Sequence, residues 1–319
     1  MSNEMIEIVE EIEEPKKENI WFLILGVLIL YGLILVFANN ILGRIVSSET
    51  LESKPYLYQI NLFVILLVFF LVIVPFLFRI PERNQTYLQF LKKIKLIKIQ
   101  PIIAVLGLGI TTGVIFLVFL LLSSLVSVAI IGGELILDFR LLWVGYGFSE
   151  YLYRALIPGI WEEVAFRGIV LVLLLKKYSK QNSIIINSIL FGLFHLINLV
   201  NMRYSIYPEV VAINVIFQVI YTTAAGFVFA YLFVKTESLI PSILSHFTLD
   251  AFGPFLQTIV FGTLSLADIA ILRTSQTVLG IGLIPAIVNV LIIYLVYWLW
   301  KKKRFFEPVI LEDKMKLIE

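Results

Sequence analysis

Long apolar runs, separated by short polar stretches, dominate the chain from residue 20 to residue 300. Each run is close to the ~20 residues that an α-helix needs to cross the hydrocarbon core of a bilayer. The fold class that we predict is therefore all-α, a polytopic transmembrane helical bundle with about eight spans. The predicted spans are 20–39, 59–78, 102–129, 146–175, 183–200, 210–234, 239–260 and 278–300.

Composition supports the same class of protein. Hydrophobic residues make up 60% of the chain and charged residues 15%, whereas soluble domains are about 45–50% apolar. The net charge of +2 is small, and we find no basic, aromatic-interleaved patch, so we expect no nucleic-acid partner. The absence of cysteine excludes disulfides, thiolate nucleophiles and cysteine metal sites.

Glycine and proline mark irregular points in the predicted helices. The fourth run is interrupted by Pro158 and Gly159, which predicts either one broken helix or a short lead-in helix followed by the true span. Pro241 is expected in the first turn of the seventh span. Gly226 and Ala230 have the small-xxx-small spacing that lets two helices approach closely in a membrane.

The distribution of lysine and arginine predicts the orientation of the bundle. Basic residues gather before the first span and after the second, fourth, sixth and eighth, all on one side if eight spans are present. The acidic N-terminal segment does not have the pattern of a secretory signal, and we find no organelle-targeting signal. We therefore expect an integral membrane protein of a prokaryotic plasma membrane, with both termini cytoplasmic.

These patterns divide the chain into five predicted parts. They are an acidic cytoplasmic tail (1–19), N-terminal transmembrane helices (20–140), a membrane core that contains the polar motifs described next (141–261), a last transmembrane segment (262–300) and a basic cytoplasmic tail (301–319).

Ionisable side chains in three of the runs carry the chemistry. His195 and His246 are the only histidines, and each lies in its own apolar run. A third run holds Glu162, Glu163 and Arg167. Charged groups within a span are costly and usually mark a functional site. Counted from the predicted cytoplasmic ends at ~1.5 Å per residue, Glu162, His195 and His246 lie at overlapping depths and are expected to meet.

The first polar motif is Glu-Glu-x-x-x-Arg. Glu163 and Arg167 are at positions i and i+4, so they can pair on one helix face. Glu162 points about 100° away from Glu163 on an α-helix, which leaves it available for another partner. The alternative is a purely structural ion pair, with Glu162 acting as a capping residue after the Pro-Gly pair.

The second and third motifs each contain a histidine. Phe191 and His195 share a helix face, and the alternative to a functional role is an interior histidine that bridges two helices. Asp250 follows His246 by one turn, an arrangement that fixes the imidazole tautomer and favours the imidazolium. The alternative here is a hydrogen bond that only braces the helix.

The three motifs occur in a fixed order, EExxxR, FxxxH and HxxxD, on successive runs, while HExxH and GxGD are absent. In this order they resemble the CAAX prenyl protease type II family, also called the CPBP or bacteriocin-processing family of intramembrane glutamic endopeptidases. The resemblance covers roughly residues 145–261. It implies that Glu162 is the catalytic glutamate and that His195 acts with it on a water molecule. Glu163 and Arg167 would be supporting residues.

The third motif contains a departure from that family. By resemblance, His246 stabilises the oxyanion, whereas the position of Asp250 is often asparagine in the family. An ionised aspartate has no hydrogen to donate to an oxyanion. We therefore expect Asp250 to lie behind His246 and hold it as the imidazolium.

The resemblance implies an intramembrane endopeptidase that hydrolyses a peptide bond in a hydrophobic or lipidated, CAAX-like substrate without a cofactor. Its expected partners are a peptide or lipidated-protein substrate and the lipid bilayer. Two alternatives stay open. The first is a zinc-dependent membrane protease that uses the same residues, because histidine and glutamate are zinc ligands. The second is a transporter or non-catalytic membrane scaffold.

Overall fold

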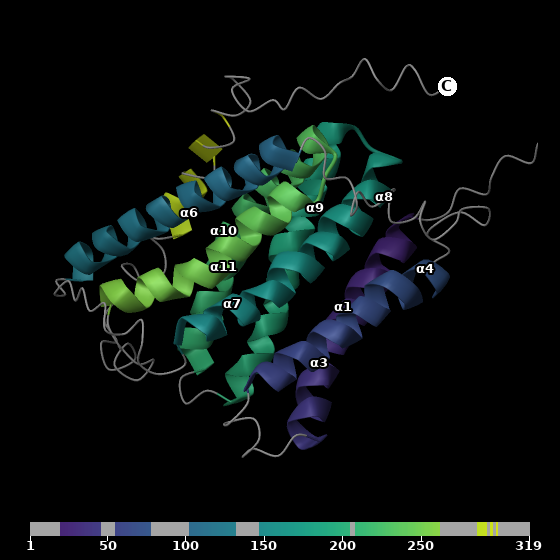
Figure 1. Cartoon of the computed structure of the whole chain (residues 1–319), viewed down its shortest axis with the longest axis horizontal. Coiled ribbons are helices and arrows are strands. Elements are labelled where there is room, and N and C mark those ends of the chain that lie inside the picture. Colours follow the sequence, from purple (N-terminus) through teal and green to yellow (C-terminus); the bar gives the residue numbers. More distant parts are fainter. Residues whose placement is uncertain are drawn as a thin grey trace, which may run out of the picture.

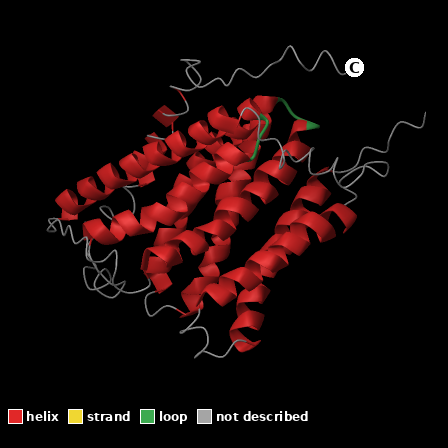
Figure 2. Cartoon of the chain, in the orientation of Figure 1, coloured by secondary structure: helices red, strands yellow, loops and turns green. Residues whose placement is uncertain are grey.

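In the computed structural model, the described residues are 20–45, 55–77, 102–131, 147–204 and 208–261, with 286–291, 294, 295 and 298 near the C-terminus. These residues are almost all helical and include no strand (Figure 2). The predicted all-α helical bundle is therefore confirmed. The two predicted tails, 1–19 and 301–319, lie outside the described residues.

Helices occur in all of the first seven predicted runs, and the eighth is described only in part. Three of the helices change type along their length, to π-helical turns (η1, η3, η4) or to a 3₁₀ helix (η5). The elements are α1 (Ile20–Ile45), α3 (Pro55–Val68), η1 (Phe69–Ile73), α4 (Val74–Leu77), α6 (Ile102–Ile131), α7 (Gly147–Ile157), η3 (Pro158–Glu162), η4 (Val164–Leu171), α8 (Val172–Leu175), α9 (Lys180–Phe194), η5 (His195–Tyr204), α10 (Pro208–Thr236) and α11 (Ile240–Phe261).

Length and composition qualify five helices of the described chain as candidate membrane spans. They are Ile20–Phe37, Gln59–Phe76, Ile102–Ser123, Lys180–Val200 and Val211–Thr236. The runs 146–175 and 239–260 are helical but are not among these five. These two runs contain the charged and polar residues of the predicted site, which lower their mean hydropathy.

The predicted interruption at the Pro-Gly pair is a change of helix type: the short lead-in α-helix α7 ends at Ile157 and the π-helix η3 begins at Pro158, while the chain stays helical. The backbone stays in the helical region through Ile157 (φ −69°, ψ −59°) and Glu163 (φ −67°, ψ −40°). Proline lacks an N–H and its ring clashes with the preceding turn of an α-helix. The chain widens into π-helical turns from Pro158 onward, which is one way a helix continues past such a residue.

Two helix pairs pack on one side of this irregular segment. α6 lies along α11, and α9 lies along α10 (Figure 1). The predicted close approach at Gly226 is present, because a Cβ at this position would lie 3.2 Å from the Cα of Ser188 on α9. Pro241 lies in the first turn of α11, as predicted.

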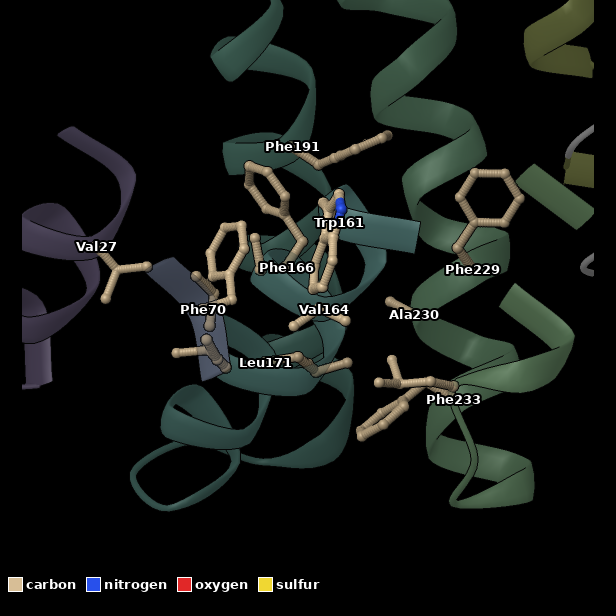
Figure 3. Packing of buried hydrophobic residues seen from close by; sticks show 14 of the residues in the cluster. Val27, Phe70, Trp161, Val164, Phe166, Leu171, Phe191, Phe229, Ala230 and Phe233 are labelled. Atoms are coloured by element: carbon tan, nitrogen blue, oxygen red, sulfur yellow. The ribbon is translucent and has the colours of Figure 1, made fainter. Parts of the chain in front are cut away.

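The π-helical segment η4 is the centre of the core. Every residue from Val164 to Leu171 is buried. Figure 3 shows Val27 of α1 and Phe70 on one side of this segment, and Phe229 of α10 on the other. Glu162 and Glu163, which directly precede η4, therefore lie next to this buried segment, and the side chains that reach them come from several helices.

Candidate active site

Four polar residues predicted from the motifs lie together in the bundle. The Oε2 atom of Glu162 is 4.0 Å from Nε2 of His195 and 4.0 Å from Nε2 of His246. Asp250 Oδ2 is 3.4 Å from the same Nε2 of His246. Three separate helical segments, η3, η5 and α11, supply these side chains, so the site is made by packing rather than by one local motif.

Glu162 and His195 each lie where the helix changes type. Glu162 is the last residue of the π-helical segment η3, and His195 is the first residue of the 3₁₀ segment η5. Non-α turns inside helices are often found at functional sites, because they change the direction in which side chains point. The sequence predicted regular helices apart from the Pro-Gly pair, so neither the π-helical nor the 3₁₀ segment was predicted.

The contacts of His195 determine which of its ring nitrogens carries the hydrogen and which has the lone pair. Nδ1 lies 2.9 Å from the carbonyl oxygen of Phe191, one turn earlier. A carbonyl oxygen can only accept a hydrogen bond, so Nδ1 carries the hydrogen. In the neutral ring, Nε2 then has a lone pair, and this nitrogen is the one that faces Glu162.

Glu163 holds two other residues of the site with a single oxygen. Its Oε1 accepts a hydrogen bond from Nη1 of Arg167 at 3.0 Å, and its side chain is fully buried. The predicted Glu163–Arg167 ion pair is thus confirmed. The same Oε1 is 2.8 Å from Nδ1 of His246 on α11, a contact that the sequence analysis did not predict.

Arg167 is held by four groups in a fully buried position. Besides the pair with Glu163, its Nη2 donates to the carbonyl oxygen of Gly226 at 3.3 Å. Its guanidinium carbon lies 4.2 Å from the ring centre of Phe191 and 5.2 Å from that of Phe229. Cation–π contacts of this kind stabilise a desolvated arginine, so this residue joins α9 and α10 to the central helix.

Asp250 does not lie behind His246 as the sequence analysis expected. Glu163 occupies that position, at Nδ1, whereas Asp250 lies beside Nε2, the nitrogen that faces Glu162. The side chain of Asp250 is 33% exposed, and that of Glu163 is 0% exposed. The buried Glu163 therefore orients the imidazole, and Asp250 lies at the open side of the site.

Residues 144–252 match the model of the family described as type II CAAX prenyl endopeptidase Rce1-like. This segment is Rce1-like. The match begins before α7 and ends within α11, so it contains every site residue named above. It supports a CAAX-type endopeptidase activity in general and, with the apolar helices, an integral membrane protein. No curated protein and no solved structure matches the chain.

Within the Rce1-like segment, Asn187 and Phe229 are two residues of the site region that the sequence analysis missed. Asn187 is fully buried on α9, and its Nδ2 donates to the carbonyl oxygen of Phe166 in η4 at 2.8 Å. Phe229 stacks on the ring of His246, with 5.0 Å between ring centres and 20° between ring planes. An asparagine in an apolar run is a usable signal for a helix-to-helix hydrogen bond, whereas a phenylalanine in such a run gives none.

The zinc alternative depends on how the donor atoms of the Rce1-like segment are spaced. Among the described residues, no group of three or more histidine, cysteine, aspartate or glutamate side chains is arranged to hold a metal ion. Zinc binds nitrogen and oxygen ligands at ~2.0–2.2 Å with tetrahedral angles. Tetrahedral ligands at these distances are ~3.3–3.6 Å apart. Glu162 Oε2 is farther than that from each histidine, at 4.0 Å, whereas Asp250 Oδ2 is 3.4 Å from Nε2 of His246.

Proposed function

We propose that this protein is an intramembrane endopeptidase that uses Glu162 and His195 to activate water against a peptide bond. The observation that carries the proposal is the position of Glu162 Oε2, buried and 4.0 Å from the Nε2 atoms of both histidines, within the Rce1-like segment. We propose a hydrophobic or lipidated, CAAX-like substrate, because the site lies inside a bundle of apolar helices.

The spacing of Glu162 and His195 suits one water molecule. Oε2 of Glu162 and Nε2 of His195 are 4.0 Å apart. A water oxygen placed about 2.8 Å from each of them would make an Oε2···O···Nε2 angle of about 90°. That angle is near the H–O–H angle of water, so one water can donate a hydrogen bond to each base. Removal of a proton by this pair would leave a hydroxide-like nucleophile for the carbonyl carbon.

His246 is suited to the negative charge that develops on the carbonyl oxygen. Glu163 accepts from Nδ1 at 2.8 Å and keeps the ring oriented, so that in the imidazolium form the Nε2–H points toward Glu162 and the reaction centre. A donor placed at an oxyanion typically contributes ~3–4 kcal/mol to the transition state. The proton taken by the Glu162–His195 pair would return to the leaving amine, and no covalent enzyme intermediate is needed.

Asp250 is the fourth residue of the proposed catalytic group. Its carboxylate beside Nε2 of His246 favours a protonated imidazole, which is the better donor to an oxyanion. Because Glu163 already orients the ring, Asp250 is proposed to tune the charge of His246 rather than its position.

The test is cleavage by the purified protein in liposomes. A farnesylated CAAX peptide is added, and release of the C-terminal tripeptide is followed by mass spectrometry. We expect cleavage by the unchanged protein and by Glu209→Gln, an exposed glutamate in the first turn of α10. We expect none by Glu162→Gln. Comparison of membrane peptides from cells with either protein extends the test to substrates that are not prenylated.

The same assay separates the alternatives. A zinc-dependent enzyme would lose activity with a chelator of divalent metals and regain it with zinc, whereas we expect full activity in the chelator. A transporter or scaffold would give the same membrane peptides with the unchanged protein and with Glu162→Gln. Either result would contradict the proposed mechanism.

The location of both termini in the cytoplasm of a prokaryote, and the division of the chain into five parts, are also proposals. The chain contains no cysteine, so single cysteines can be introduced without background. We expect Ser2→Cys and Lys302→Cys to be labelled by a membrane-impermeant maleimide only after the membrane is opened. If only one of the two cysteines were labelled in sealed cells, the termini would lie on opposite sides of the membrane. The number of spans would then be odd, which contradicts the proposed orientation.

A further inference from the structure

A tyrosine outside the Rce1-like segment lies close to the site. Tyr31 of α1 is fully buried, and among the described residues its hydroxyl has no hydrogen-bond partner. Burial of a hydroxyl without a partner is unfavourable, and such a group in a folded protein calls for a specific explanation. The explanation has to come from the surroundings of this phenol.

Aromatic rings connect Tyr31 to the residues that directly precede the two proposed bases. Its ring stacks on Phe194, which directly precedes His195, with 5.0 Å between centres and 12° between planes. Its edge also contacts Phe70 at 5.0 Å. Phe70 in turn stacks on Trp161, which directly precedes Glu162, at 6.0 Å and 16°.

α1 packs closely against η5 next to Tyr31. A Cβ at Gly32, the next residue, would lie 3.3 Å from Cδ1 of Ile197 in η5. Tyr31 therefore has little freedom to move away, and its position follows from the packing of α1 on the segment that begins with His195.

The unpaired atoms of this region are complementary. Tyr31 offers an O–H donor, and Oε2 of Glu162 is a buried acceptor that has no hydrogen-bond partner among the described residues. The phenol lies within electrostatic range of the Glu162 carboxylate.

We propose that Tyr31 is a positioning residue for Glu162, donating a hydrogen bond to its carboxylate through one water molecule. This inference rests on the proposed function, because it assigns Tyr31 to the base of that reaction. It makes α1 part of the catalytic unit, although α1 lies outside the residues that match the family. The hydrogen bond would fix the rotation of the carboxylate, so that Oε2 keeps facing the two histidines.

Tyr31→Phe tests the proposal because it keeps the stacked ring and removes only the hydroxyl. We expect kcat to fall at least about tenfold with KM unchanged, as for loss of a group that acts only on the chemical step. We expect only a small change in melting temperature, because the stacked ring is kept and the hydroxyl has no direct partner among the described residues. Tyr178→Phe is the matched control, because it also removes one tyrosine hydroxyl next to α1. The hydroxyl of Tyr178 accepts from Nε1 of Trp21, a residue of α1, at 3.0 Å. This control should keep the kcat of the unchanged protein.

A second measurement is independent of substrate. The infrared carboxyl band of Glu162 is assigned from the difference between the unchanged protein and Glu162→Gln. Tyr31→Phe should shift this band, and Tyr178→Phe should not. An unshifted band together with an unchanged kcat would overturn the role of Tyr31. If Glu162→Gln itself cleaves normally, the proposed function fails instead.

Discussion

Glu163 and His246 are joined by a contact of 2.8 Å between Oε1 and Nδ1, although 83 residues separate them in the sequence. This contact ties α11 to the central helix at the level of the proposed base. Because the same oxygen accepts from Arg167, the supporting ion pair and the proposed oxyanion donor form one network. A substitution of Arg167 should therefore also affect the orientation of His246, and a substitution of His246 should affect the ion pair.

Glu162→Gln should abolish cleavage while the protein inserts and folds normally. Glu162 Oε2 has no hydrogen-bond partner among the described residues, so the amide removes a base without removing a structural contact. Cleavage of the farnesylated peptide and the melting temperature in detergent are measured together. Near-normal turnover by Glu162→Gln would contradict its assignment as the base.

Arg167→Ala should lower the free energy of unfolding by ~3–5 kcal/mol, because it leaves the buried Glu163 without its cation. The loss should appear as a lower melting temperature and a lower yield. Arg154→Ala, at an exposed position on α7, serves as the control and should change the melting temperature little. A fully stable but inactive Arg167→Ala would indicate a role in substrate binding instead.

Asp250→Asn should keep measurable activity, because the amide can still hydrogen-bond next to Nε2 of His246. Asp250→Leu should reduce kcat less than His246→Ala does, since Glu163 still orients the ring in the leucine variant. For His246→Ala we expect a loss of ~100-fold or more, typical of a lost oxyanion donor. Equal losses in both single variants would show that Asp250 is as necessary as the histidine itself.

Gly159→Ala should separate η3 from α11 and weaken both stability and activity. The added Cβ would lie 3.0 Å from the Cα of Phe247, and the backbone beside His246 has little room to yield. We expect a loss of ~1–3 kcal/mol, as for other overpacked positions. Gly107→Ala on α6 is the control, because no atom lies within 4 Å of its added Cβ. Thermal unfolding in detergent is measured for both variants. Equal melting temperatures of Gly159→Ala and Gly107→Ala would contradict the prediction.

Asn187→Leu should destabilise η4, the π-helical segment that directly follows the two glutamates. It leaves the buried carbonyl oxygen of Phe166 without its donor, at an expected cost of ~1–3 kcal/mol. Asn182→Leu, in the exposed first turn of α9, is the control and should have a small effect. If both variants melt at the temperature of the unchanged protein, Asn187 does not support η4.

The sequence by itself determined the elements and the local pairing. Continuous apolar runs of ~20 residues specify helices, because a helix satisfies its backbone hydrogen bonds within one segment, as a span in lipid requires. The Glu163–Arg167 pair was predictable because a spacing of four residues fixes two side chains on one helix face. The order of the three motifs along the chain was enough to locate the Rce1-like segment.

Only the tertiary structure decided how these helices meet. The contact of Glu163 with His246, the position of Asp250 at the open side, and the approach of Tyr31 all depend on the rotation and depth of each helix. A run that is apolar on all sides contains no periodic signal for its rotation. The π-helical turns that begin at Pro158 change the direction of every later side chain in that helix, and a regular helical period assumed from the sequence does not include them.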